Sequence, residues 1–148
     1  MIHNPTRIYN GVPPHGMHEY KLRLLTRHLL EPVADRFNLT ITSGYRTLEQ
    51  QSNLTDASGN LVPANVKAKK ISQHCLGEAV DFVADFPLAC YKWMNENLHP
   101  WVMILYYRKT FPSHIHMSML PEKTDNRGER RLLNIDGTYK VFTGSFPT

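Results

Sequence analysis

The chain has little cysteine: its 148 residues include only Cys75 and Cys90. Two thiols cannot build the disulfide framework of a small secreted domain. No second cysteine lies two or four residues from Cys75, so the closely spaced thiolates of a structural zinc site are also missing. Cys75 is therefore interpreted as a small buried residue.

Long apolar runs are absent as well, and the first residues do not predict a leader sequence. No apolar run approaches the ~18 residues of a membrane-spanning helix. Residues 1–7 do not show the basic, apolar and small-residue order of a secretory signal peptide. We therefore expect neither membrane insertion nor export by the general secretory route.

Charge of one sign is only slightly in excess, with a formal net charge of +4. Such a charge attracts anionic polymers, but the basic residues are scattered apart from the stretches 67–70 and 127–131. They are not interleaved with aromatic residues on one face, as nucleic-acid binding would require. We expect no nucleic-acid partner, and we expect residues 1–148 to form one soluble domain because no composition boundary divides them.

Several short segments have the pattern of β-strands, being β-branched, alternating or apolar. Strands are predicted at about residues 39–42, 78–83, 101–107 and 115–119. Asp136-Gly137 is a hairpin turn sequence, so the last segment, about residues 132–148, is expected to be a hairpin and tail.

Residues 18–37 predict an amphipathic helix, since apolar residues recur there at three- and four-residue steps. These residues are Leu22, Leu25, Leu29, Val33 and Phe37. Pro32 is expected to kink or divide this helix, and residues 1–16, rich in Pro, Gly and Asn, predict an irregular arm before it.

A second helix is expected over residues 87–97, where Pro87 suits the first helical turn. Thr47 and Gln50 form a capping-box pattern that predicts a short helix. Residues 53–70 show no periodicity and predict a long loop. The expected fold class is α+β, with a small antiparallel sheet and helices packed on one of its faces.

Two histidines and an aspartate are spaced so that they can meet at one ion. Side chains alternate along a strand, so His116 shares a face with His114, while Asp81 lies on one face of another predicted strand. Gly77 would let the chain turn tightly and bring His74 over Asp81. Two imidazoles and one carboxylate leave a fourth position open to water, as catalytic zinc sites do.

Spacing alone does not decide between a metal site and ordinary structural hydrogen bonds. A single histidine or aspartate is more often a hydrogen-bonded structural residue than a ligand, and triples of this kind also arise by chance. Both interpretations stay open on spacing alone.

Three motifs in the chain are specific in combination. They are Ser43-Gly44-Tyr45-Arg46, the pattern Ser72-x-His74-x-x-Gly77-x-Ala79-x-Asp81, and Ser113-His114-Ile115-His116-Met117-Ser118. Together they resemble the zinc D-Ala-D-Ala carboxypeptidase family, which includes VanX-like and VanY-like dipeptidases and phage endolysins. Asn126-Arg127 is similar to the tail of the phage-type branch. The resemblance covers about residues 18–131 and implies the Hedgehog- and DD-peptidase-like fold.

The resemblance implies that His74, Asp81 and His116 bind Zn²⁺ and that Arg46 holds the substrate and stabilises negative charge on its carbonyl oxygen. It makes His114 a partner of a metal ligand or of the oxyanion. The implied reaction is cleavage of an amide bond in a peptidoglycan stem peptide by an endolysin or a virion-associated wall hydrolase. Without a signal peptide, such a protein would stay in the host cytoplasm until lysis or travel with the virion.

Ser113 departs from the family pattern. Family members commonly carry a carboxylate three residues before the last metal histidine, where it acts as general base, and serine cannot take a proton at neutral pH. Loss of a general base costs about 10²- to 10⁴-fold in rate, and His114 is the nearest replacement in the sequence. The rival interpretation is a non-catalytic virion decoration or tail protein that keeps the peptidase fold and binds other virion proteins.

Overall fold

In the part of the chain that the structure describes, seven strands form one mixed sheet in the order β1-β2-β3-β5-β4-β6-β7. The computed structural model describes residues 1–52, 72–108, 112–119 and 130–146. The strands are β1 (Ile2–His3), β2 (Leu39–Ser43), β3 (Ala79–Ala84), β4 (Val102–Tyr107), β5 (His114–Ser118), β6 (Arg130–Ile135) and β7 (Thr138–Val141). The chain is therefore α+β, and the four strands predicted from the sequence are confirmed to within one residue at each end.

The predicted antiparallel sheet is wrong, because two of the six strand pairs are parallel: β1 with β2 and β4 with β6. Strand β5 pairs with β3 on one edge and with β4 on the other. Strand β6 therefore pairs with the edge of β4 that faces away from β5. Since β6 runs opposite to β5, it lies parallel to β4. The remaining pairs, β2–β3, β3–β5, β4–β5 and β6–β7, are antiparallel as expected.

The N-terminal segment is more ordered than the predicted irregular arm. Ile2 and His3 pair with the start of β2, and a 3₁₀ turn, η1 (Pro5–Ile8), follows them. A two-residue strand is too short to show a period in the sequence. The arm prediction for residues 1–16 is therefore wrong at its beginning.

The predicted helix at residues 18–37 is a continuous rod of three pieces: α1 (Gly16–Leu25), a π-helical turn η2 (Thr26–Leu30) and α2 (Glu31–Ala34). Pro32 has no N–H to give to the carbonyl four residues before it. The chain widens into the π turn just ahead of this proline, with the N–H of Glu31 bonded to the carbonyl of Thr26. The helix changes pitch at the predicted place instead of stopping.

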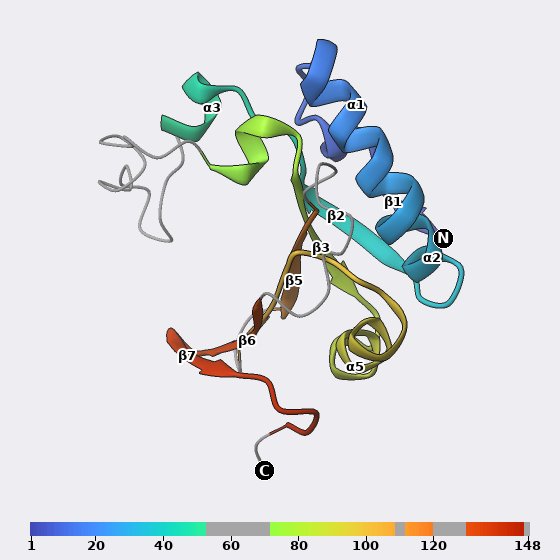
Figure 1. The fold of residues 1–148 in the computed structure, drawn as a ribbon, viewed down its shortest axis with the longest axis vertical. Helices are drawn as coiled ribbons and strands as arrows, with labels where there is room; N and C mark the ends of the chain where they lie inside the picture. Colours follow the sequence, from blue (N-terminus) through green and yellow to red (C-terminus); the bar gives the residue numbers. More distant parts are fainter. Residues whose placement is uncertain (53–71, 109–111, 120–129, 147–148) are drawn as a thin grey trace.

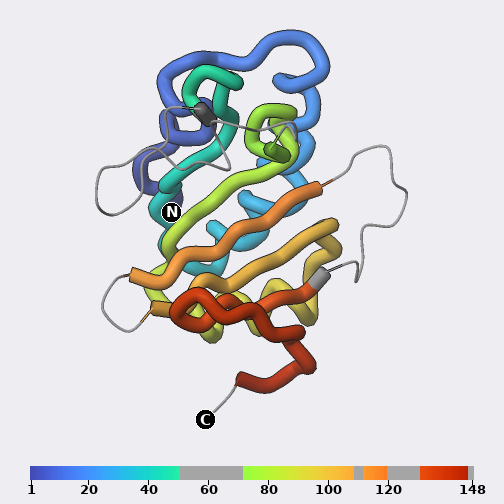
Figure 2. The backbone as a smooth tube through the Cα atoms, turned by 90° about the vertical axis from the view of Figure 1, so that its left-hand side faces the viewer, coloured from blue at the N-terminus to red at the C-terminus, as the bar shows by residue number. Residues whose placement is uncertain are grey.

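The core lies between the sheet and the long helices. Figure 1 shows α1, α2 and α5 (Pro87–Asn97) on one side of the sheet, and Figure 2 shows the strands in front of these helices. The apolar stripe of the first helix packs there, with Leu25, Leu29 and Val33 buried. Strand residues on that face, among them Phe82 and Ile115, complete the core. The opposite face of the central strands carries Asp81 and His116 beside apolar residues such as Ile104.

Two local sequence patterns give the structures they predict. The backbone N–H of Thr47 donates to Oε1 of Gln50 at 3.0 Å, and the backbone N–H of Gln50 donates to the Thr47 hydroxyl at 3.1 Å. The short helix α3 (Leu48–Ser52) starts there. Asp136 and Gly137 both have positive φ, 47° and 94°, and they join β6 to β7 as a two-residue hairpin turn.

The long loop predicted at residues 53–70 and the Asn126-Arg127 motif lie outside the described residues. Among the described helices, none combines the length and the apolar character that a membrane crossing demands.

Candidate metal centre

The candidate ligands come from two paired strands and one turn beside them. Asp81 on β3 lies directly opposite His116 on β5 in the antiparallel register, so both side chains project from the same face of the sheet. His74 comes from a 3₁₀ turn, η3 (Gln73–Leu76), that precedes β3. The three residues that the sequence singled out are therefore brought together.

The turn that carries His74 is fixed at both ends. The Ser72 hydroxyl caps its start by accepting a bond from the His74 N–H at 3.3 Å. Gly77 ends it in the left-handed region, with φ of 72°. A side chain at Gly77 would also collide with the carbonyl oxygen of His18 on α1. Glycine at this position therefore both closes the turn and allows α1 to pack against it.

The distances suit a small cation. Nε2 of His74 lies 3.3 Å from Oδ2 of Asp81, and Nδ1 of His116 lies 2.8 Å from Oδ1 of the same carboxylate. One candidate ligand atom from each residue lies within 4.8 Å of the others. Two imidazoles and a carboxylate are a donor set that suits divalent transition metals, zinc among them. The three residues fit a metal ion.

The charge of the Asp81 carboxylate is stabilised by its neighbours. Burial by itself would raise the pKa of Asp81, but the adjacent rings of His74 and His116 more than offset burial and hold that pKa well below its usual range. Asp81 is therefore ionised at neutral pH, as a carboxylate that binds a metal must be.

His74 is oriented by a backbone carbonyl. Its Nδ1 donates to the carbonyl oxygen of Gly44 at 2.8 Å, which leaves the lone pair of Nε2 facing Asp81. Gly44 follows β2, and a Cβ there would meet the backbone of Ile8. The glycine of the Ser-Gly-Tyr-Arg motif therefore lets the N-terminal segment lie close while its own carbonyl holds a candidate ligand.

Arg46 lies beside the cluster. Its backbone N–H donates to the carbonyl of His74 at 3.1 Å. Burial lowers the pKa of its guanidinium, and the nearby charge of Asp81 opposes that effect. An arginine stays charged even so. Its Nε is buried without a hydrogen-bond partner among the described residues, so one donor of the guanidinium is unsatisfied.

His114 lies on the same face as His116, one alternation earlier on β5, as predicted. Its ring stacks on Tyr106 of β4 with 4.5 Å between centroids and 8° between planes. Burial lowers the pKa of His114, more than the charge of Asp81 raises it. The imidazole is therefore neutral at pH 7 and stacked on Tyr106, on the same face of the sheet as Asp81 and His116.

Ser113 directly precedes β5. Its hydroxyl accepts a hydrogen bond from the backbone N–H of Arg108 at 3.3 Å. Ser113 thus binds the backbone just after β4, and it has no group that titrates near neutral pH.

Two neighbours of the cluster were missed by sequence reasoning. Oε1 of Gln73 lies 3.4 Å from Nε2 of His116, and the buried Glu78 pairs with Lys21 of α1. Both contacts join residues far apart in the sequence, at separations of 43 and 57. Neither contact follows a spacing rule; Gln73 could have been suspected only from its position beside His74.

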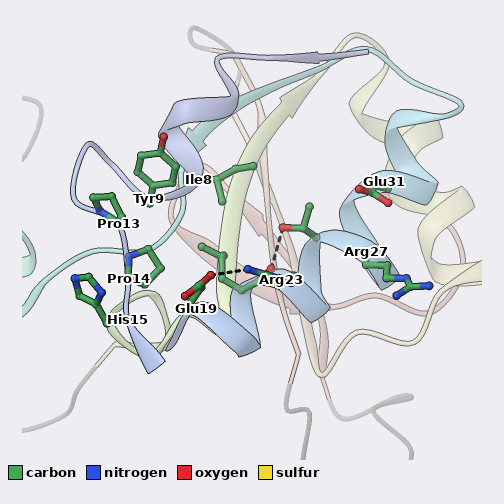
Figure 3. Close-up of a pocket in the computed structure, with 11 residues that line it drawn as sticks. Ile8, Tyr9, Pro13, Pro14, His15, Glu19, Arg23, Arg27 and Glu31 are labelled. Atoms are coloured by element: carbon green, nitrogen blue, oxygen red, sulfur yellow. Dashed lines mark hydrogen bonds and ion pairs between the residues drawn. The ribbon is translucent and has the colours of Figure 1, made fainter. Parts of the chain in front are cut away.

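A hollow apart from the cluster lies between the N-terminal segment and α1 (Figure 3). It has a volume of about 770 Å³, and Tyr9, Pro13 and Arg27 are among its lining residues. Glu19 and Arg23 pair with each other beside it, one helical turn apart. The three candidate ligands are not among the described residues that line this hollow, so it is separate from the metal centre.

Comparison of the chain with protein-family models, with curated proteins and with solved structures found no match. The geometry of the site itself offers three candidate ligands for one cation, a guanidinium beside them and a stacked imidazole on the same face.

Proposed function

We propose that His74, Asp81 and His116 bind one zinc ion and that the chain is a metallopeptidase. The single observation that carries this is the convergence of three ligand atoms, one from each residue, within 4.8 Å of one another. Three protein ligands leave a coordination position open, which is the arrangement of catalytic rather than structural zinc. Bound zinc would supply Lewis acidity, polarising a carbonyl group and making water a better nucleophile at neutral pH.

The chain's own residues provide the rest of the machinery. The guanidinium of Arg46 would bind the carbonyl oxygen as negative charge develops on it, and one such preorganised donor is worth about 3–4 kcal/mol in known enzymes. His114, neutral and stacked on Tyr106, would accept a proton from the attacking water. As proton acceptor, His114 would take the place of the carboxylate that Ser113 does not provide.

The proposed substrate is an amide bond in the stem peptide of peptidoglycan. It rests on the resemblance of the Ser-Gly-Tyr-Arg and Ser-x-His-x-x-Gly-x-Ala-x-Asp motifs to the zinc D-Ala-D-Ala carboxypeptidases, and so does the proposed DD-peptidase-like fold. The protein would act on the wall as a lysis protein or as part of a virion.

A second candidate function is a non-catalytic virion protein that keeps this fold. Ser113 favours it, because the serine hydroxyl is bonded to the backbone of Arg108 and cannot replace a general base. Against it, a module without metal chemistry has no need for three converging ligands.

Digestion of purified peptidoglycan separates the two. Zinc-loaded protein is expected to release fragments whose masses identify one cleaved amide bond, and His116→Ala is expected to release none. Arg46→Ala should cleave about 10²- to 10³-fold more slowly while it keeps its zinc. Zinc-loaded, folded wild type that releases no fragment would favour the virion protein.

A further inference from the structure

We propose that Gln73 is a positioning residue for the metal centre: it holds the ring of His116 so that Nδ1, and not Nε2, faces the metal. This inference rests on the proposed metal site. The main observation in its support is that the two ring nitrogens of His116 have different partners. Nδ1 lies 2.8 Å from Oδ1 of Asp81, and Nε2 lies 3.4 Å from Oε1 of Gln73.

An amide oxygen can only accept hydrogen bonds. With zinc bound, a bond from His116 to Oε1 of Gln73 places the ring proton on Nε2 and leaves the lone pair on Nδ1, whereas without an ion Nδ1–H can donate to the ionised carboxylate of Asp81 at 2.8 Å. That lone pair and the carboxylate of Asp81 then face each other, and a cation between them satisfies both. If the ring were turned over, carbon atoms would face both Asp81 and Gln73.

The two histidines of the site thus present different ring nitrogens to the metal. His74 gives its Nδ1–H to the carbonyl of Gly44 and presents Nε2, whereas His116 gives its Nε2–H to Gln73 and presents Nδ1. Metal-bound imidazoles commonly donate their second N–H to such a partner, which fixes the tautomer and raises the basicity of the ligand.

Gln73 and His74 are consecutive residues of the η3 turn. The same turn therefore supplies one candidate ligand and the hydrogen-bond partner of another, so the Ser72 cap and Gly77 position both. The contact of 3.4 Å is long for an N–H···O bond. Gln73 therefore biases the ring without locking it, and the expected effect is at the low end of the range for such partners.

Zinc titration by calorimetry tests the proposal in the full chain. Gln73→Leu removes the acceptor, and the zinc affinity should fall about tenfold. Gln73→Glu keeps an acceptor, and a carboxylate accepts more strongly than an amide, so its affinity should equal or exceed that of wild type. The control is Asn97→Ala on α5, whose exposed amide bonds only its own helix among the described residues and which should bind zinc as wild type does.

The second readout is the tautomer of each histidine in the zinc-loaded protein, measured by two-bond ¹H–¹⁵N correlation. Metal at Nε2 of His74 and at Nδ1 of His116 is expected. Metal at Nε2 of His116 would overturn the inference, and so would an unchanged zinc affinity in folded Gln73→Leu or an equal loss in Gln73→Glu. A wild-type chain that binds no zinc would instead overturn the metal site and this inference with it.

Discussion

The ion pair between Lys21 and Glu78 should be a main support of the metal centre. The side chains of Lys21 and Glu78 are only 18% and 5% exposed. The backbone of Glu78 also forms two hydrogen bonds near the site. Its N–H donates to the carbonyl of Gln73 in the η3 turn, and its carbonyl accepts from the N–H of Met119, just after β5. The pair therefore ties α1 to the turn that carries His74 and to the end of β5.

Removing one partner should cost more than an ordinary surface pair would. Lys21→Met leaves a buried carboxylate uncompensated, and such losses amount to about 3–5 kcal/mol. Because Lys21 is not fully buried, we expect about 3 kcal/mol, the lower end of that range. In a chain of this size that corresponds to a fall of roughly 6–12 °C in Tm. The double variant Lys21→Met with Glu78→Leu should recover most of the loss, because an apolar pair of similar volume often replaces a buried ion pair without cost.

Urea unfolding of the four members of this double-mutant cycle, without metal, measures the coupling. The control is the pair Glu19–Arg23 on the same helix, whose side chains are 51% and 75% exposed. Glu19→Gln should cost less than about 1 kcal/mol. If Lys21→Met costs no more than the control, or if the two single changes at Lys21 and Glu78 simply add, the pair does not support the site.

Three further predictions concern single positions. Gly77→Ala should destabilise the chain by more than about 1 kcal/mol, because φ is positive and the new Cβ meets His18; urea unfolding equal to wild type would contradict this. Burial raises the pKa of the Cys90 thiol to about 12 and also raises that of Cys75. Since the thiolate is the reactive form, neither thiol should react with a disulfide reagent at pH 8 until the chain unfolds, and fast labelling of the native protein would show that the burial is wrong. Ser113→Glu should speed peptidoglycan cleavage by about 10²-fold or more at unchanged zinc affinity, whereas zinc-loaded wild type and variant that are both inactive would end the enzyme interpretation.

Much of the site could be predicted from the sequence because it depends on local rules. Alternation along a strand placed His114 and His116 on one face, and the metal hypothesis required Asp81 to approach them. Gly77 predicted the turn that brings His74 over the sheet. These rules need only neighbouring residues, and the three ligands converge as expected.

The parts that could not be predicted depend on partners distant in the sequence. The parallel pairing of β1 and of β6 is decided by which strand edges are still free when the sheet assembles, and a two-residue strand such as Ile2–His3 carries no period. Gln73 and the Lys21–Glu78 pair are likewise visible only once distant segments lie together.

The central claim is that His74, Asp81 and His116 together hold one metal ion, and the zinc content of the folded chain tests it most directly. Chelator-stripped protein titrated with zinc, and then analysed for metal by mass spectrometry, should bind one ion per chain. Asp81→Asn and His116→Ala should each lose most of that binding while the fold, measured by circular dichroism, is kept. Folded protein that takes up no zinc, or variants that bind it as tightly as wild type does, would contradict the account.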